Sequence, residues 1–212
     1  MAKTNAFDEH YNDYEKWFDL NKYAYESELK AIRHFIPEKG RGVEVGVGSG
    51  LFAQPLGITN GIEPSAQMRE IAKQRGLNVK QGVAENVPLE NGSVDYVLFV
   101  TTICFVDNIE QSLKETWRIL RKGGRVVIGF VDKESKIGQV YQQNKQFSTF
   151  YKEATFFSAR EVESLLSNLG FSKVEFVQTL FGKLKDIDRV QNFKPGHGEG
   201  SFVVVKGERA IE

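Results

Sequence analysis

The stretch VEVGVGSGLF, from Val43 to Phe52, holds three glycines directly after an apolar run. Together with Glu44 they form the pattern acidic-x-G-x-G-x-G at Gly46, Gly48 and Gly50. Glycine at a turn between a strand and a helix adopts positive φ without strain and lets a ligand approach the backbone closely. The spacing differs from the dinucleotide fingerprint G-x-G-x-x-G and from the phosphate loop G-x-x-x-x-G-K-[ST]. The turn therefore predicts a backbone-lined ligand site of another kind, with a simple tight connection as the alternative.

Polar residues at the ends of later predicted strands could complete this site. Glu63 ends the second strand in the segment GIEPS, where a carboxylate can accept hydrogen bonds from both hydroxyls of a ribose. Ala84 and Glu85 follow the third strand, and Thr101 and Thr102 lie near the end of the fourth. The alternative for Glu63 and for the two threonines is an ordinary polar position at a strand end.

Cysteine and histidine chemistry has little support in this chain. Cys104 is the single cysteine, which excludes an intramolecular disulfide and a cysteine-based metal cluster, and it is expected to be a buried small hydrophobe. The three histidines, His10, His34 and His197, do not have metal-ligand spacing, so no metal is predicted. The residues that could act as a general base are His10, Tyr14, His197 and Glu199. None of them is assigned, so the catalytic residue is left open.

Strands and helices alternate along most of the 212 residues, which predicts a doubly wound, mainly parallel α/β sheet of seven strands. The last two strands have no helix between them and should pair antiparallel at one sheet edge. We expect a single domain over 1–212, with an N-terminal helical cap over 1–37. Strands are predicted over 42–47, 58–64, 77–82, 93–106, 125–132, 171–182 and 198–208, and helices over 49–57, 65–76, 108–124 and 158–170.

The segment 133–157 is polar and aromatic and does not fit this alternation. It follows the fifth strand, at the edge where open α/β sheets bind ligands, and we interpret it as a lid insertion. A solvated surface helix is the alternative. Tyr141 of this segment is a candidate for contact with substrate, as are Tyr11, Tyr14 and Trp17 of the cap. The cap aromatics could equally be a packing stripe.

Composition limits the cellular context and the partners. Lys plus Arg and Asp plus Glu are both 28, so the formal net charge is zero and no overall attraction to nucleic acid is expected. The N-terminus lacks the apolar core of a secretory signal, and no stretch approaches the length of a membrane span. We therefore expect a cytoplasmic protein with a small-molecule substrate, no nucleic-acid or membrane partner, and an oligomeric state that the sequence does not define.

In order and spacing, the glycine turn, GIEPS, the AE pair and TTIC resemble the class I S-adenosylmethionine-dependent methyltransferases, most closely the type 11 methyltransferase-domain group. The resemblance covers about 40–130 strongly and implies a Rossmann-like methyltransferase fold with S-adenosylmethionine as cofactor. It implies that the turn wraps the methionine part, that Glu63 holds the ribose, that the AE pair meets the adenine edge, and that the segment at Thr101 lies beneath the sulfonium. The cofactor residues that it implies are Glu44, Gly46, Val47, Gly48, Gly50, Glu63, Pro64, Met68, Ala84, Glu85, Thr101, Thr102 and Ile103.

One position departs from the pattern of this family. Members often carry Asp before the AE pair, as a partner for the adenine amino group, whereas this chain has Val83. The segment TTIC stands where methyltransferases that act on nucleic-acid amino groups carry N/D-P-P-Y/F, so a small acceptor is favoured. The alternatives are a protein that binds S-adenosylmethionine without catalysis and a nicotinamide-dependent α/β enzyme.

Overall fold

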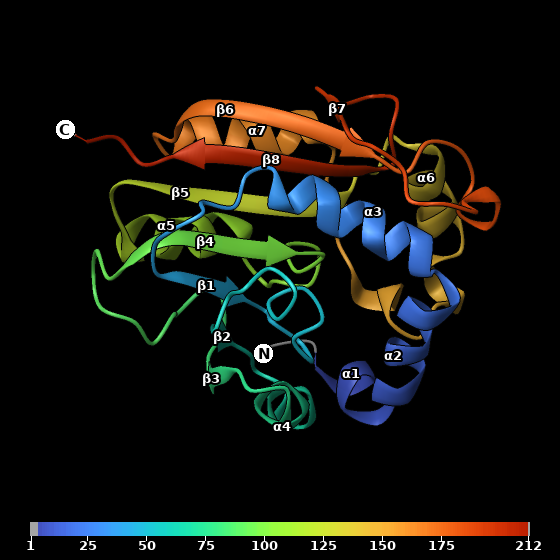
Figure 1. Cartoon of the computed structure of the whole chain (residues 1–212), viewed down its shortest axis with the longest axis horizontal. Helices are drawn as coiled ribbons and strands as arrows, with labels where there is room; N and C mark the ends of the chain where they lie inside the picture. The colour runs from blue at the N-terminus through green and yellow to red at the C-terminus, as the bar shows by residue number, and fades with distance from the viewer. Residues whose placement is uncertain (1–3, 212) are drawn as a thin grey trace.

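The computed structural model describes residues 4–211; residues 1–3 and 212, which the predicted domain and cap ranges include, lie outside the described residues. One eight-stranded sheet has the order β3-β2-β1-β4-β5-β8-β6-β7, with helices on both of its faces (Figure 1). The strands are β1 (Gly42–Val45), β2 (Asn60–Ile62), β3 (Asn78–Lys80), β4 (Val94–Val100), β5 (Leu120–Val131), β6 (Ser172–Thr179), β7 (Lys194–Pro195) and β8 (Phe202–Glu208). The helices are α1 (Asn5–Glu9), α2 (Tyr11–Leu20), α3 (Lys22–Arg33), α4 (Ala66–Gln74), α5 (Ile109–Ile119), α6 (Lys136–Gln143) and α7 (Ala159–Asn168), with 3-10 turns η1 (Lys145–Phe147), η2 (Tyr151–Glu153) and η3 (Leu184–Asp186).

The sheet confirms the predicted fold class. Strands β3, β2, β1, β4 and β5 are parallel, and β8 lies antiparallel between β5 and β6. The last two long strands pair with each other as expected, but β8 is an inner strand, because it also pairs with β5 along its length. The eighth strand is the two-residue β7, which extends the edge beside β6.

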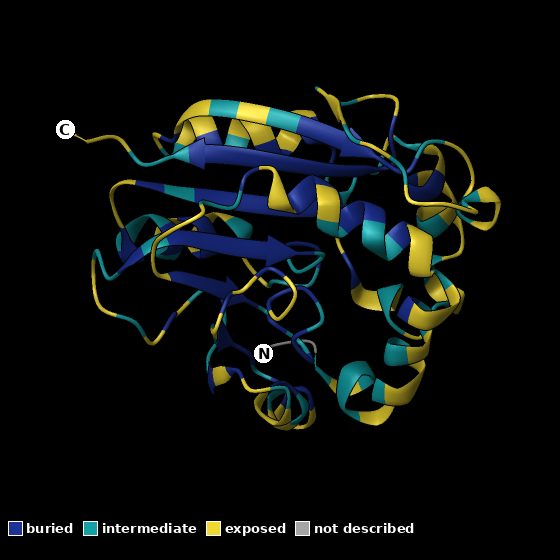
Figure 2. Cartoon of the chain, viewed as in Figure 1, coloured by how far each residue is buried: buried dark blue, intermediate teal, exposed yellow. Residues whose placement is uncertain are grey.

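Two apolar cores lie on opposite faces of the sheet. The side chains of β4 alternate between them: Leu98 and Val100 pack with α3, whereas Val97 and Phe99 pack with α5 and α7. Figure 2 shows the central strands buried throughout, while the helices expose their outer faces. A strand buried on both faces accounts for the nearly continuous apolar run in its sequence.

Two parts of the fold lie beyond the carboxyl ends of the parallel strands. The cap helices α1 and α2 and the helix α6 are grouped at this end, toward which β1 and β4 point in Figure 1. The insertion that contains α6 is closed at its base, because the amide of Lys133 donates to the carbonyl of Phe157 at 3.0 Å. The Lys133 ammonium also pairs with Glu161 at 2.6 Å.

The helix predicted over 49–57 is wrong: the structure has a series of turns there. Pro55 cannot donate a backbone hydrogen bond, and Gly57 adopts a φ of +75°, so the segment cannot propagate a helix. Among the described residues, no helix has the length and apolar character needed to cross a bilayer.

Candidate functional site

A cavity of about 230 Å³ lies at the carboxyl edge of the sheet. It is lined by the cap, the glycine turn, the ends of β2, β4 and β5, the insertion and the segment after β6. The glycine turn and the ends of β2 and β4 form one end, where the cofactor is expected; we call it the cofactor end. The other end is formed by α2, α3, α6 and the segment after β6, and we call it the acceptor end.

A side chain at each of the three glycines of the turn would meet different surroundings. At Gly46, with a φ of +71°, a Cβ would lie 2.2 Å from the methyl carbon of Thr102. At Gly50, with a φ of +89°, it would lie 2.4 Å from Leu77, which stands between α4 and β3 and outside the cavity lining. At Gly48, with a φ of +55°, the nearest atom is the Tyr14 hydroxyl at 3.5 Å, because this residue faces the cavity. Only at Gly48 would a side chain enter the space of a ligand without first striking the protein.

Glu63 is bound to the glycine turn. Its Oε2 accepts from the amide of Gly48 at 2.8 Å, and its Oε1 accepts from the amide of Ser65 at 2.9 Å. Burial raises the pKa of this carboxyl to about 7, against the opposing effect of the two amides. Each carboxylate oxygen has two lone pairs and uses one for these amides, and Glu63 lines the cavity, so the group fits the predicted role of accepting hydrogen bonds from two ribose hydroxyls.

Glu44 lies behind the turn and outside the cavity lining. The residue is 2% exposed, and its Oε2 has no hydrogen-bond partner among the described residues. Burial, followed by the charge of Glu63, raises the pKa of this carboxyl well above its ordinary value. A buried carboxylate oxygen without a donor fits a site that receives a positively charged group, as the resemblance implies for the cofactor ammonium.

The residues predicted from sequence to meet the adenine lie together in the structure. Pro64, Met68, Ala84 and Glu85 all line the cavity. The Glu85 carboxylate, however, accepts from the amides of Asp107 at 2.7 Å and of Asn108 at 3.0 Å, which fastens it to the start of α5.

Asp107 is an acidic residue of this end that the sequence analysis missed. It lines the cavity, as does Val83, the position where the family often has an acid. Asp107 therefore joins Glu85 as a candidate partner for the adenine amino group. The only sequence signal for it is its place before the helix-capping Asn108.

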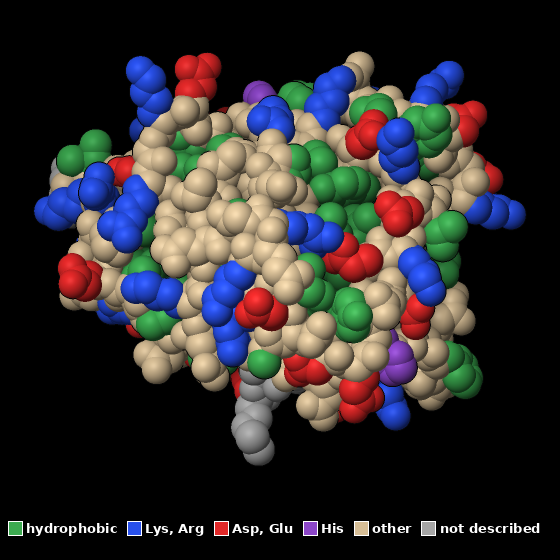
Figure 3. Space-filling model, turned by 60° about the horizontal axis from the view of Figure 1, so that its bottom comes forward, with side chains coloured by type: hydrophobic (Ala, Val, Ile, Leu, Met, Phe, Trp, Pro, Cys, Tyr) green, Lys and Arg blue, Asp and Glu red, His purple; other side chains and the backbone are tan. Residues whose placement is uncertain are grey.

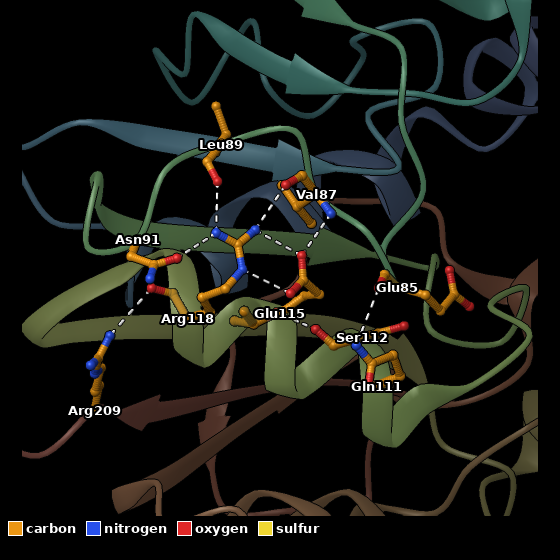
Figure 4. A network of polar contacts seen from close by, with 10 residues as sticks. Glu85, Val87, Leu89, Asn91, Gln111, Ser112, Glu115, Arg118 and Arg209 are labelled. Carbon is orange, nitrogen blue, oxygen red and sulfur yellow. Dashed lines mark hydrogen bonds and ion pairs between the residues drawn. The ribbon is translucent and has the colours of Figure 1, made fainter.

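A polar network positions the loop that carries Ala84 and Glu85 (Figure 4). From α5, the guanidinium of Arg118 donates to the carbonyl of Leu89 at 2.8 Å, to Asn91 at 2.8 Å and to the carbonyl of Val87 at 2.9 Å. Glu115 accepts from the amide of Val87 at 2.9 Å, and its hydrogen bond from Arg118 lowers the pKa of the Glu115 carboxyl. One ion pair on α5 thus fixes the backbone of this loop.

The residues expected beneath the sulfonium are divided by the structure. Thr101 and Thr102 line the cavity, and Thr101 has a φ of +49°, which is uncommon for a β-branched residue. The Thr102 hydroxyl donates to the carbonyl of Val100 at 3.0 Å. Ile103 is 2% exposed and instead borders a smaller neighbouring cavity. Val47 is also a core residue outside the lining. Strained backbone at Thr101 is of the kind that concentrates at ligand sites.

Of the substrate candidates, Tyr14, Trp17 and Tyr141 line the cavity, whereas Tyr11 does not. Residues 7–14 of the cap and the insertion meet through aromatic rings. Phe150 lies 5.3 Å from Phe7 and 6.1 Å from Tyr14 between ring centroids.

The cap is also held by polar contacts. Asp8 accepts from the hydroxyl of Ser65 at 2.5 Å, and Glu15 pairs with Arg75, which donates to the carbonyl of Ser49 at 2.6 Å. These contacts join α1 and α2 to the elements around the glycine turn.

Three of the four base candidates lie outside the cavity lining. His197 packs its ring against Phe176, Glu199 pairs with Lys194 at 2.7 Å, and His10 lies at the surface between α1 and α2. Tyr14 does line the cavity, but burial and the nearby carboxylates raise its pKa, so it stays protonated.

Glu28 is a second lining residue that the sequence analysis missed. It lies on α3 and is 4% exposed, and burial raises the pKa of its carboxyl to about 8. It stands four residues after Ala24 and four before Ile32, on the buried face of α3. A charged residue within an apolar stripe is the signal that could have identified it.

Comparison with known proteins relates this chain to a family of methyltransferases. The sequence profile described as Methyltransferase domain matches residues 43–128. A crystal structure from Thermotoga maritima, of an S-adenosylmethionine-dependent methyltransferase described as a possible histamine N-methyltransferase, is 48% identical, with 97% of this chain and 99% of that chain covered and a TM-score of 0.95. An uncharacterized protein of Methanocaldococcus jannaschii is 40% identical over 97% of this chain and 99% of its own length. The malonyl-[acyl-carrier protein] O-methyltransferase of Methylococcus capsulatus is 25% identical over 73% of this chain and 60% of its own length.

Proposed function

Because the chain belongs to the class I S-adenosylmethionine-dependent methyltransferases with a type 11 domain, we propose that it transfers the cofactor's methyl group to a small molecule held at the acceptor end of the cavity. One observation carries this proposal. The cavity continues from Gly48 and Glu63, at the cofactor end, to a chamber lined by buried and half-buried side chains of α2, α3, α6 and the segment after β6.

When bound, the cofactor supplies a methyl group on a positively charged sulfur, which an N, O, S or C nucleophile displaces in line. The residues of this chain have to orient the two molecules and exclude water. Glu63 and the glycine turn would hold the cofactor, and Phe7, Tyr14 and Phe150 would close the space above it. Aromatic faces beside a sulfonium also contribute cation–π stabilisation.

A small acceptor agrees with the charges of the cavity lining and of the outer surface. The face that carries α1 and α4 has both acidic and basic side chains, with Lys and Arg gathered toward one edge (Figure 3). Among the described residues that line the cavity, none is Lys, Arg or His. A phosphate-rich polymer would therefore lack basic partners in the chamber. The name of the Thermotoga protein makes histamine the first acceptor to test.

The test combines binding with transfer. Calorimetry should show that S-adenosylhomocysteine binds and NAD does not, and methyl-labelled S-adenosylmethionine should deliver label to an acceptor from a panel of amines, alcohols, thiols and carboxylates. Binding of NAD in place of S-adenosylhomocysteine would contradict the cofactor assignment for this cavity. Tight binding without transfer to any member of the panel would favour the non-catalytic alternative.

A further inference from the structure

Glu28 presents the carboxylate of α3 to the acceptor end of the cavity. Tyr141 of α6, Leu180 after β6 and Leu184 of η3 line the same cavity. The residue is 4% exposed, so most of its side chain is removed from bulk water. A carboxylate in such a place is costly unless a donor or a cation joins it.

The described part of the chain does not supply that donor. Among these residues, no hydrogen bond or ion pair reaches the Glu28 carboxylate, and burial is the sole cause of its pKa shift. Two lining carboxylates of the cofactor end differ in this respect, because Glu63 accepts from two backbone amides and Glu85 accepts from two others. Glu28 is therefore an acceptor whose partner, water or a ligand, comes from the cavity.

The residues that line the cavity favour a positively charged partner. The described lining residues include five acids, Asp13, Glu28, Glu63, Glu85 and Asp107, and no Lys, Arg or His. Aromatic rings of α2, α6 and η2 surround the same space, among them Tyr14, Trp17, Tyr141 and Tyr151. Aromatic faces around a carboxylate favour an organic cation with an apolar body, whereas an acceptor bearing a phosphate or carboxylate would find no positive partner.

We propose that the methyl acceptor is an amine with an apolar body, whose ammonium group binds the Glu28 carboxylate, which then receives the proton that the nitrogen must lose. The proposal deepens the proposed function and rests on it. An ammonium nitrogen has no lone pair, so it cannot attack a methyl group. In the proton transfer, an N–H bond of the ammonium breaks, an O–H bond forms on Glu28, and the electron pair remains on nitrogen as the nucleophile.

The surroundings of Glu28 suit this step. Its pKa of about 8 lies close to neutral pH, where a carboxylate both gains and loses a proton readily. The titratable groups whose charges couple to it are Tyr14 of α2, Tyr25 of α3, Tyr141 of α6 and Tyr151 of η2, and all four phenol pKa values are raised. Glu44 of β1, coupled to Tyr14 and Tyr25, also has a raised pKa. Glu28 is thus the buried carboxylate of the acceptor end that can take a proton from the substrate.

The first experiment compares ligands of one shape and different charge on the protein saturated with S-adenosylhomocysteine. Calorimetry with 2-phenylethylamine and histamine is set against 2-phenylethanol and 3-phenylpropanoate. We expect at least one amine to bind tenfold or more tightly than the alcohol, and the anion to bind most weakly. Glu28→Gln should remove the preference for the amine without changing the affinity for S-adenosylhomocysteine. Glu28→Asp should restore part of it. Glu26→Gln, on the same helix and outside the cavity lining, is the matched control.

The second experiment measures how many protons are released when the amine binds. At pH 7 a carboxyl with a pKa of about 8 is mostly protonated, so uptake of an ammonium ion should release close to one proton. Calorimetry of the amine in two buffers of different ionisation enthalpy measures this number, which should fall to near zero in Glu28→Gln. A purely structural role for Glu28 would leave the number of released protons unchanged.

The outcomes separate this inference from the function on which it rests. If S-adenosylhomocysteine does not bind the wild-type protein, the proposed function fails. If it binds but the alcohol binds as well as the amines, or no amine of the set binds, or Glu28→Gln keeps the amine preference and the proton release, the assignment of Glu28 is wrong.

Discussion

Three carboxylates that line the two ends of the cavity differ in their hydrogen bonds. At the cofactor end, Glu63 and Glu85 accept from backbone amides of the turns that follow the strands. At the acceptor end, Glu28 has no donor within the described chain and is surrounded by side chains from α2, α3, α6 and the segment after β6. The first end is thus built largely by backbone and accepts one ligand shape, whereas the second is built by side chains that can change while the fold remains. From this difference we expect that substitutions can alter cofactor binding and acceptor binding separately.

Gly48→Val should give the largest effect and would test the backbone-built end. The added side chain enters the ligand space, and a β-branched residue is strained at a φ of +55°. We expect affinity for S-adenosylhomocysteine, measured by calorimetry, to fall at least about 100-fold, because the backbone approach is blocked.

The matched control for this variant is Gly57→Val. Gly57 has a φ of +75° and lies outside the lining, and a Cβ at this position would meet nothing within 4 Å. This variant carries similar backbone strain, so its melting temperature should fall while binding is kept. Normal binding by Gly48→Val would mean that the turn is only a connection.

Glu28→Gln should give the second largest effect, on stability without any ligand. The folded-state pKa of Glu28 is raised to about 8, so the folded protein binds more protons than the unfolded chain above the ordinary carboxyl pKa. The stability contributed by this group is complete at low pH and is lost as pH rises through 8. Between pH 6 and pH 8 the free energy of unfolding contributed by Glu28 falls by about 2 kcal/mol. Glu28→Gln should not show this decrease.

Melting curves at the two pH values measure this prediction. At each pH, the melting temperature of wild type is subtracted from that of Glu28→Gln. This difference should be about 5 °C larger at pH 8 than at pH 6. Glu44 and Glu63 titrate in both proteins and cancel in this comparison. Glu26→Gln should follow the wild-type curve, and parallel curves for Glu28→Gln and wild type would show that Glu28 has an ordinary pKa.

Glu63→Gln tests whether charge, as well as shape, matters at the cofactor end. The amide group keeps the acceptor oxygen but loses one charge-assisted site for a ribose hydroxyl, so binding of S-adenosylhomocysteine should weaken about tenfold. Because the pKa of Glu63 is raised to about 7, the wild-type affinity should increase as pH rises from 6 to 8 and the carboxyl ionises. The variant should lack this increase. Glu70→Gln, exposed on α4, serves as the control, and an identical pH dependence in both variants would remove Glu63 from the explanation.

The same contrast explains which parts of the site could be predicted from sequence. Gly48, Glu63 and Thr101 each follow a strand of the parallel sheet, so chain order alone brings them to one edge. Glu28 and Leu180 reach the acceptor end through the packing of α3 against the far strands, which no local pattern encodes. The two-residue β7 is too short to show a period of two, so the sheet was predicted with seven strands instead of eight.

Phe150→Ala should give the smallest effect and concerns the contact between the cap and the insertion. Phe150 packs against Phe7 and Tyr14, whereas Phe147, three residues earlier in the same insertion, is 81% exposed. Aromatic pairs contribute about 0.5–1.5 kcal/mol beyond their buried area, so Phe150→Ala should weaken S-adenosylhomocysteine binding about two- to tenfold. Phe147→Ala should leave it unchanged.

Hydrogen exchange separates loss of closure from loss of folding: in wild type, amides of α1, α2 and the insertion should gain protection when the ligand binds, while the sheet changes little. In Phe150→Ala this gain in protection should be smaller, whereas the amides of β4 should be as protected as in wild type. If both variants behave alike, the rings do not hold the cap and insertion together, and closure of the cofactor end would depend on the polar contacts of Asp8 and Glu15.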